Sequence, residues 1–214
     1  MKGLIYKDIL AMRRLAGTYL LFFLVYGGLA VAGVFDISVL GGMVVLLGAM
    51  VPMSSISMDD TSGWARFAVA SPTGRRGIVS GKYLFTLLSL VVSTVLVGLL
   101  LMVSSFLGIS EERPIDCLLI TLCCTGVALL MDAVLLPLTF QFGAEKARIL
   151  NTILFAAVFG SIVLLGGAVS NKLSLPSPPA WLISALPVLL ALAAIIGFFI
   201  SYCISQSIYA KKEF

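Results

Sequence analysis

A single ionisable residue, Asp132, lies in the middle of a long apolar stretch, residues 117–144. At about 1.5 Å of rise per residue it would lie roughly 15 Å from Phe142, near the middle of a bilayer. A carboxyl there is costly unless it is protonated or paired, so binding of a coupling ion is one interpretation. A packing carboxyl that bonds a Thr or Ser of a neighbouring helix is the other, because no Lys or Arg lies inside an apolar stretch. Both interpretations stay open on the sequence.

The sequence lacks the residues that most kinds of enzyme active site require. There is no histidine, so a zinc site with His ligands and a Ser-His dyad are both excluded. The triplet 111–113, Glu-Glu-Arg, is best interpreted as part of a solvated loop. Gly81-Lys82 departs from a phosphate-binding loop, with Arg76 where a Gly is needed and Tyr83 where a Ser or Thr is needed. We therefore expect no catalytic residue, no metal and no bound cofactor in this chain.

The polar segment 58–82 is the longest one in the chain. Residues 59–63, Asp-Asp-Thr-Ser-Gly, supply the acids and N-cap side chains that are favoured at a helix start. Trp64 and Phe67 follow at helical spacing and predict a short amphipathic helix. Such a helix would lie on lipid or fit a groove on a partner protein. A plain basic loop with an interfacial helix is the alternative.

The composition shows which elements must position these residues. The 214 residues are 60% hydrophobic and 11% charged, with a mean hydropathy of +1.14, whereas a soluble domain is about 25% charged. Long charge-poor stretches without the alternation of barrel strands predict membrane-spanning helices. The predicted class is a single all-α integral membrane domain over residues 1–214, with six transmembrane helices. Their expected bounds are residues 17–35, 37–57, 83–107, 116–142, 149–170 and 181–206.

The N-terminal residues 1–16 combine basic side chains with apolar ones at helical spacing. This pattern favours a basic amphipathic helix that lies on the inner membrane surface over a cleavable targeting segment. An ordinary positively charged flank that fixes orientation is the alternative. The charged residues of this segment are Lys2, Lys7, Asp8, Arg13 and Arg14.

The basic residues are unevenly distributed between the two sides of the predicted membrane. Six spans place twelve of the 14 Lys and Arg residues on the side of the two termini, and only Arg113 and Lys172 on the other side. Basic residues in short loops mark the cytoplasmic side. We therefore expect both termini, and the segment 58–82, to be cytoplasmic.

Three segments resemble the small permeases of the ABC-2-type transporter family, a group that includes bacterial exporter permeases for phenol-soluble modulins. MKGLIYKDIL at 1–10 is similar to the family's N-terminal elbow helix. MDDTSGW at 58–64, running to SPTGRRGIVSGKY at 71–83, carries the most specific likeness. PLTFQFGAEKAR at 137–148 and the six-span layout extend it over nearly the whole chain.

This resemblance implies a permease subunit of an ATP-driven exporter in the bacterial cell membrane. Two permease chains, alike or different, would pair above two ATP-binding subunits, and those subunits would hold the ATP and Mg²⁺. The expected substrates are amphipathic or antimicrobial-type peptides. Segment 58–82 would contain the coupling helix that docks on the ATPase, with a second contact after the fourth span. The implied coupling residues are Asp59, Asp60, Trp64, Arg66 and Phe67, and the second contact is Glu145, Lys146 and Arg148.

Two other classes of function remain open on the sequence. An ion-coupled secondary carrier would use Asp132, but it predicts inverted repeats, and residues 1–107 and 108–214 show no convincing repeat. A non-transporting membrane anchor would recruit a cytoplasmic partner through the same segment 58–82.

Overall fold

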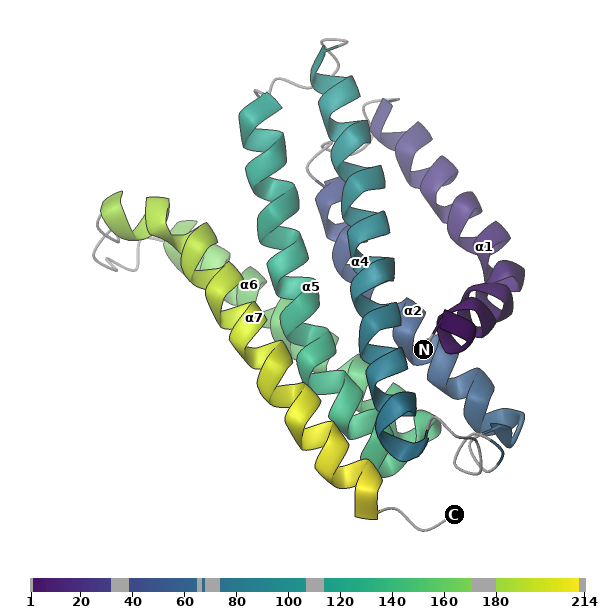
Figure 1. Ribbon diagram of the computed structural model, residues 1–214. Coiled ribbons are helices and arrows are strands. Elements are labelled where there is room, and N and C mark those ends of the chain that lie inside the picture. The colour runs from purple at the N-terminus through teal and green to yellow at the C-terminus, as the bar shows by residue number, and fades with distance from the viewer. Residues whose placement is uncertain are drawn as a thin grey trace.

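The computed structural model describes residues 2–31, 39–64, 67, 74–106, 114–170 and 180–211. These residues form long helices and no strand, which confirms the predicted all-α class. The helices assemble into one bundle in which α5 is central (Figure 1). Arg66 and the triplet 111–113 lie outside the described residues. The helices are α1 Lys2–Val31, α2 Val39–Thr61, α4 Gly74–Phe106, α5 Pro114–Phe142, α6 Ala144–Ser170 and α7 Ala180–Lys211.

Several of these helices have the length and composition of membrane spans. Within the described residues, Gly74–Phe106, Ile115–Phe142 and Pro187–Lys211 each satisfy both criteria. A fourth span results if Gly3–Arg13 and Gly17–Leu29, which meet at an angle of 57° within α1, are taken together. The chain is thus a helical membrane protein, while six spans stay a prediction.

Close packing between helices holds the bundle together. Helix α5 packs against α7, α2 and α4, whereas α1 contacts α2 and α4, and α6 contacts α5 and α2. A Cβ added to Gly48 of α2 would lie 2.7 Å from Leu90 Cδ1 of α4 and 3.1 Å from Ala128 Cβ of α5. Small residues are favoured where membrane helices approach closely, because association there depends on packing rather than on the hydrophobic effect. Gly48 therefore fixes the distance between three helices.

The outer surface of the bundle is apolar along α4 and α7. On α4 the exposed side chains include Val91, Val95 and Leu99, and on α7 they include Ile196 and Ile200. These large side chains recur at helical spacing, and each of them is more than half exposed. Such surfaces suit lipid, which is as apolar as they are.

The end of α2 differs from the prediction. Asp59 and Asp60 do not start a helix, because α2 continues through them to Thr61. The N–H of Ser62 donates to Met58 O at 3.1 Å, and Gly63 follows with φ 66°, a left-handed conformation that ends helices. The prediction that these two acids begin the next helix was therefore wrong, and Gly63, the last residue of the predicted segment 59–63, marks the boundary before Trp64. The two acids lie in the last turn, where the helix dipole disfavours negative charge.

Candidate functional site: a buried charge cluster between three helices

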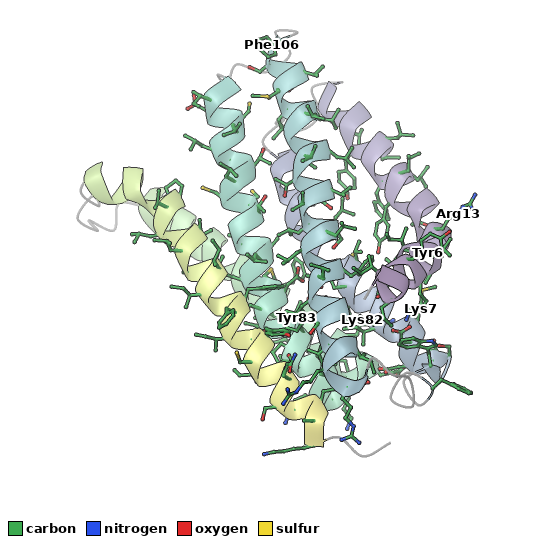
Figure 2. All side chains as sticks on the ribbon, viewed as in Figure 1. Tyr6, Lys7, Arg13, Lys82, Tyr83 and Phe106 are labelled. Carbon is green, nitrogen blue, oxygen red and sulfur yellow. The ribbon has the colours of Figure 1, made fainter. Side chains whose placement is uncertain are left out.

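Four charged side chains from three helices meet at one end of the bundle. Lys82 Nζ of α4 donates to Asp8 Oδ1 of α1 at 2.9 Å and to Ser55 Oγ of α2 at 2.7 Å. It also lies 2.6 Å from Asp59 Oδ2, without the alignment of a hydrogen bond. Lys7 Nζ lies 3.0 Å from Asp8 Oδ1 and 2.5 Å from Asp59 Oδ1. Two cations thus alternate with two anions, and we call Lys7, Asp8, Asp59 and Lys82 the charge cluster (Figure 2 labels both lysines).

The exposed fraction of the side chains in the charge cluster increases from the inside of the bundle to the outside. Asp8 is 2% exposed and Lys82 is 5% exposed, while the side chains of Asp59 and Lys7 are 14% and 28% exposed. Burying charges carries a desolvation cost that pairing only partly offsets, so such a cluster is weak evidence for added stability. Removal of one partner, however, leaves an unpaired buried charge. The cluster consequently favours one arrangement of α1, α2 and α4 over others.

Local sequence explains how each helix supplies its part of the charge cluster. On α1, Leu4, Asp8 and Met12 lie four residues apart on one face, and that face packs on the bundle. Leu4 of this face packs against Gly81 of α4, where an added Cβ would lie 3.4 Å from Leu4 Cβ. Asp59 lies in the last turn of α2, where the two lysines offset the unfavourable position of its charge.

Trp64 extends the charge cluster toward the cytoplasmic segment predicted from the sequence. Lys7 Nζ lies 3.6 Å from the centroid of the Trp64 ring, within the range of a cation–π interaction. The ring also packs against a buried apolar cluster that joins α2, α4, α5 and α7. The members of that cluster are Ile56, Ile78, Val79, Tyr83, Leu136, Phe140 and Tyr209.

Phe67 has the opposite environment, although it lies only three residues after Trp64. Its side chain is 79% exposed, while Trp64 is partly buried. The sequence places the two aromatic residues on one stripe, but in the structure Trp64 packs on the bundle and Phe67 is exposed. Arg66, the third residue of the implied coupling helix, lies outside the described residues.

The second predicted contact follows directly on the end of α5. Gly143 separates α5 from α6 with φ 81°, and a Cβ there would lie 3.9 Å from Asp60 Oδ2. The end of α2 and the start of α6 are therefore neighbours. Glu145, Lys146 and Arg148 are all exposed in the first two turns of α6. Arg148 differs from the other two because it lines a cavity toward α2.

Asp132 lies within the bundle and apart from the charge cluster. It is 1% exposed on α5, and its Oδ2 has no hydrogen-bond partner among the described residues. The nearby Tyr83 hydroxyl is hydrogen-bonded to Ser201 at 2.6 Å and to Ser205 at 2.7 Å. No ion pair of the described residues includes Asp132.

Sequence reasoning identified Asp59 and Trp64 but missed their partners. Lys82 was considered only as a positive flank and as part of a failed phosphate-loop pattern, and Lys7 and Asp8 only as parts of a surface helix. One signal was available: Lys82 directly precedes the charge-free stretch 83–110 and follows a glycine, so a lysine there needs a partner or a route to water. The identity of that partner depends on packing between helices.

Three comparisons with known proteins were made, and one of them, with models of protein families, gave a match. A family model described as "ABC-2 family transporter protein" matches residues 3–210. Searches of curated proteins and of solved structures gave no match. The family match extends over nearly all of the described helices α1, α2, α4, α5, α6 and α7, and it includes the residues of the charge cluster.

Proposed function

Because the chain belongs to the ABC-2 family of transporter proteins, we propose that it is the permease subunit of an ATP-driven exporter of amphipathic peptides. Six spans hold it in a bacterial cell membrane with both termini in the cytoplasm. Two permease chains pair and work with two copies of a separate ATP-binding subunit. That subunit supplies the ATP site and Mg²⁺, so this chain is not itself an enzyme.

The observation that carries this proposal is the charge cluster together with Trp64. The cluster joins the start of α1, the end of α2 and the start of α4 through short ion pairs. Trp64 contacts Lys7 directly. A push on the segment after α2 would therefore reach three helices as one body rather than being absorbed by a loose loop. Rigid transmission of this kind is what a transporter needs if a partner subunit drives its change of state.

Phe67 provides the surface on which the partner would act. A phenylalanine that is 79% exposed outside a membrane span costs hydration free energy unless a partner covers it. Phe67 would thus contact the ATP-binding subunit, while Trp64, three residues earlier, packs on the helix bundle. A movement of that subunit would pass from Phe67 to Trp64 and so to the permease. Glu145 and Lys146, both exposed at the start of α6, supply a second polar contact nearby.

A groove between α4 and α7 supports an amphipathic substrate. Its volume is about 710 Å³, and its walls are mainly apolar, with Leu87 of α4 and Phe199 of α7 among the lining residues. One end carries hydroxyl groups, because Ser80 Oγ and Tyr202 Oη are hydrogen-bonded at 2.8 Å beside Gln206. An apolar wall with a polar end matches a peptide that has one apolar face and one polar face.

Co-purification with the ATP-binding subunit tests the proposal. The tagged permease is produced with that subunit, and both the recovered subunit and its Mg-ATP hydrolysis are measured. We expect Phe67→Ala to weaken binding of that subunit about thirtyfold and so to reduce its recovery, since an exposed aromatic anchor contributes on the order of 2 kcal/mol to an interface. Phe106→Ala is the matched control, because Phe106 is 78% exposed at the far end of α4 from Lys82 (Figure 2). If the wild-type permease retains no ATP-hydrolysing subunit, the proposal fails.

The buried carboxyl of Asp132 favours a second candidate, an ion-coupled carrier. Its Oδ2 lacks a hydrogen-bond partner among the described residues, and a buried carboxyl oxygen of this kind can bind an ion or a proton. Membrane vesicles that contain ATP and a fluorescent amphipathic peptide separate the two candidates when the proton gradient is dissipated. A carrier stops under this condition, whereas an ATP-driven exporter continues. Transport that is absent under every condition, with the ATP-binding subunit still bound, would instead indicate a membrane anchor.

A further inference from the structure

A polar cavity lies between α2 and α6, apart from the charge cluster and from the α4–α7 groove. Its volume is about 410 Å³. It combines a cation, hydroxyl groups, an amide and thioethers within one enclosure. The lining residues are Met50, Met53, Ser54 and Ser57 of α2, and Arg148, Asn151 and Thr152 of α6.

Asn151 gives this cavity an unmet hydrogen-bonding need. The residue is 8% exposed, and its Oδ1 has no partner among the described residues. Its Nδ2 donates only to Met53 Sδ, at 3.5 Å, and a thioether is a weak acceptor. If the amide is turned over, the unmet atom becomes the nitrogen instead of the oxygen. In either orientation one polar atom of the buried Asn151 amide has no strong hydrogen-bond partner among the described residues.

Arg148 and the hydroxyl groups complete the polar lining. The Arg148 guanidinium offers five N–H donors and makes no ion pair within the part of the chain that the structure describes. Ser54 and Thr152 donate to carbonyls of their own helices, at 2.8 Å and 3.1 Å, so their oxygens can still accept. The cavity therefore suits a molecule that carries an anionic group and also a hydrogen-bonding group of its own.

The cavity lies near the ends of α2 and α6, at a level of the bundle where a lipid headgroup would lie. Arg148 lies four residues after the start of α6, about 6 Å along the helix axis. Ser57 lies four residues before the end of α2, on the same end of the bundle, because Asp60 adjoins Gly143. The neighbouring Ile149 and Ile153 are 65% and 59% exposed and provide an apolar surface for acyl chains beside the opening.

We propose that this cavity binds the headgroup of a membrane phospholipid. Arg148 donates to the phosphate oxygens, and the Asn151 amide bonds a hydroxyl or ammonium group of the headgroup. The acyl chains lie along Met50, Ile149 and Ile153. The site depends on the membrane location of the chain and not on ATP-driven export, so the two proposals can fail independently.

Lipid titration of the purified full-length chain tests this site. Short-chain phosphatidylglycerol, short-chain phosphatidylethanolamine and inorganic phosphate are each added, and bound molecules are counted by native mass spectrometry. We expect Arg148→Gln to weaken binding of the lipid about tenfold, as loss of a charge-assisted hydrogen bond does. Arg76→Gln, which removes an exposed cation that does not line the cavity, should bind lipid as the wild type does.

A second variant separates binding from structure. Asn151→Leu keeps the side-chain volume but removes both polar atoms, so lipid binding should fall severalfold while thermal stability stays the same or rises. A merely structural role for Asn151 would lower both together. The proposal is overturned if either variant binds lipid as tightly as the wild type. It is equally overturned if inorganic phosphate binds as tightly as the lipid, or if Arg148→Gln only dissociates a pair of permease chains.

Discussion

Two aspartates of this protein are almost equally buried and yet have opposite surroundings. Asp8 is 2% exposed and Asp132 is 1% exposed. Asp8 is 2.9 Å from Lys82 and 3.0 Å from Lys7, whereas Asp132 pairs with no cation in the described ranges. Burial alone therefore does not assign a role to a carboxyl group. The paired carboxyl holds helices in register, whereas Asp132 is buried with no charged partner among the described residues to offset its desolvation cost.

Lys82→Met should show the largest effect, because it removes the most buried cation of the charge cluster. Asp8 would lose its closest partner inside the protein, and we expect the free energy of unfolding to fall by about 3–5 kcal/mol. Thermal unfolding of the detergent-purified protein measures this change. The double variant Lys82→Met with Asp8→Leu should recover most of the loss, since no buried charge is then left unpaired. If the double variant is no more stable than the single one, the pairing of Asp8 and Lys82 does not govern stability.

Lys7→Met tests whether exposure grades the charge cluster as the structure indicates. Lys7 also has two acidic partners and contacts Trp64, but its side chain is 28% exposed. We expect a loss of about 1–2 kcal/mol, because partly exposed ion pairs and cation–π contacts are each weak.

The response to salt provides the control for this second prediction. The destabilisation by Lys7→Met should shrink when the ionic strength is raised from 0.05 to about 0.5 M, because salt screens exposed pairs much more than buried ones. The effect of Lys82→Met should change little over the same range. Equal salt responses of the two variants would contradict the graded cluster.

The sequence was sufficient for the class and for the positions of most helices. Charge-free stretches predicted helices because a backbone in lipid must satisfy its own hydrogen bonds, and every predicted span overlaps a helix of the structure. The same rule drew attention to Asp132. It could not pair Lys82 with Asp8, since 74 residues separate them and only the packing of α1 on α4 brings them together.

Local patterns also failed where tertiary packing decides. Asp59 looked like a helix start from its type and its neighbours, but Gly63 places the boundary after it. Trp64 and Phe67 have the spacing of one stripe, and spacing alone cannot say that Lys7 lies over one ring while the other is exposed. Asn151 resembles any polar residue at the start of an apolar helix, and its missing partner becomes visible only when α2 lies beside it.

Asp132→Asn should have the smallest effect on stability and decides what the unpaired carboxyl does. The amide keeps the shape of the side chain and removes its capacity to bind and release a proton, so we expect the free energy of unfolding to change by less than about 1 kcal/mol. If the carboxyl only packs between helices, ATP-driven peptide transport in vesicles also continues at the wild-type rate. Transport that stops, while the ATP-binding subunit stays bound and the protein stays folded, would make Asp132 an ion or proton site. In that case Asp8 would be a structural carboxyl that pairs helices, and Asp132 would be a functional carboxyl that binds an ion or a proton during transport.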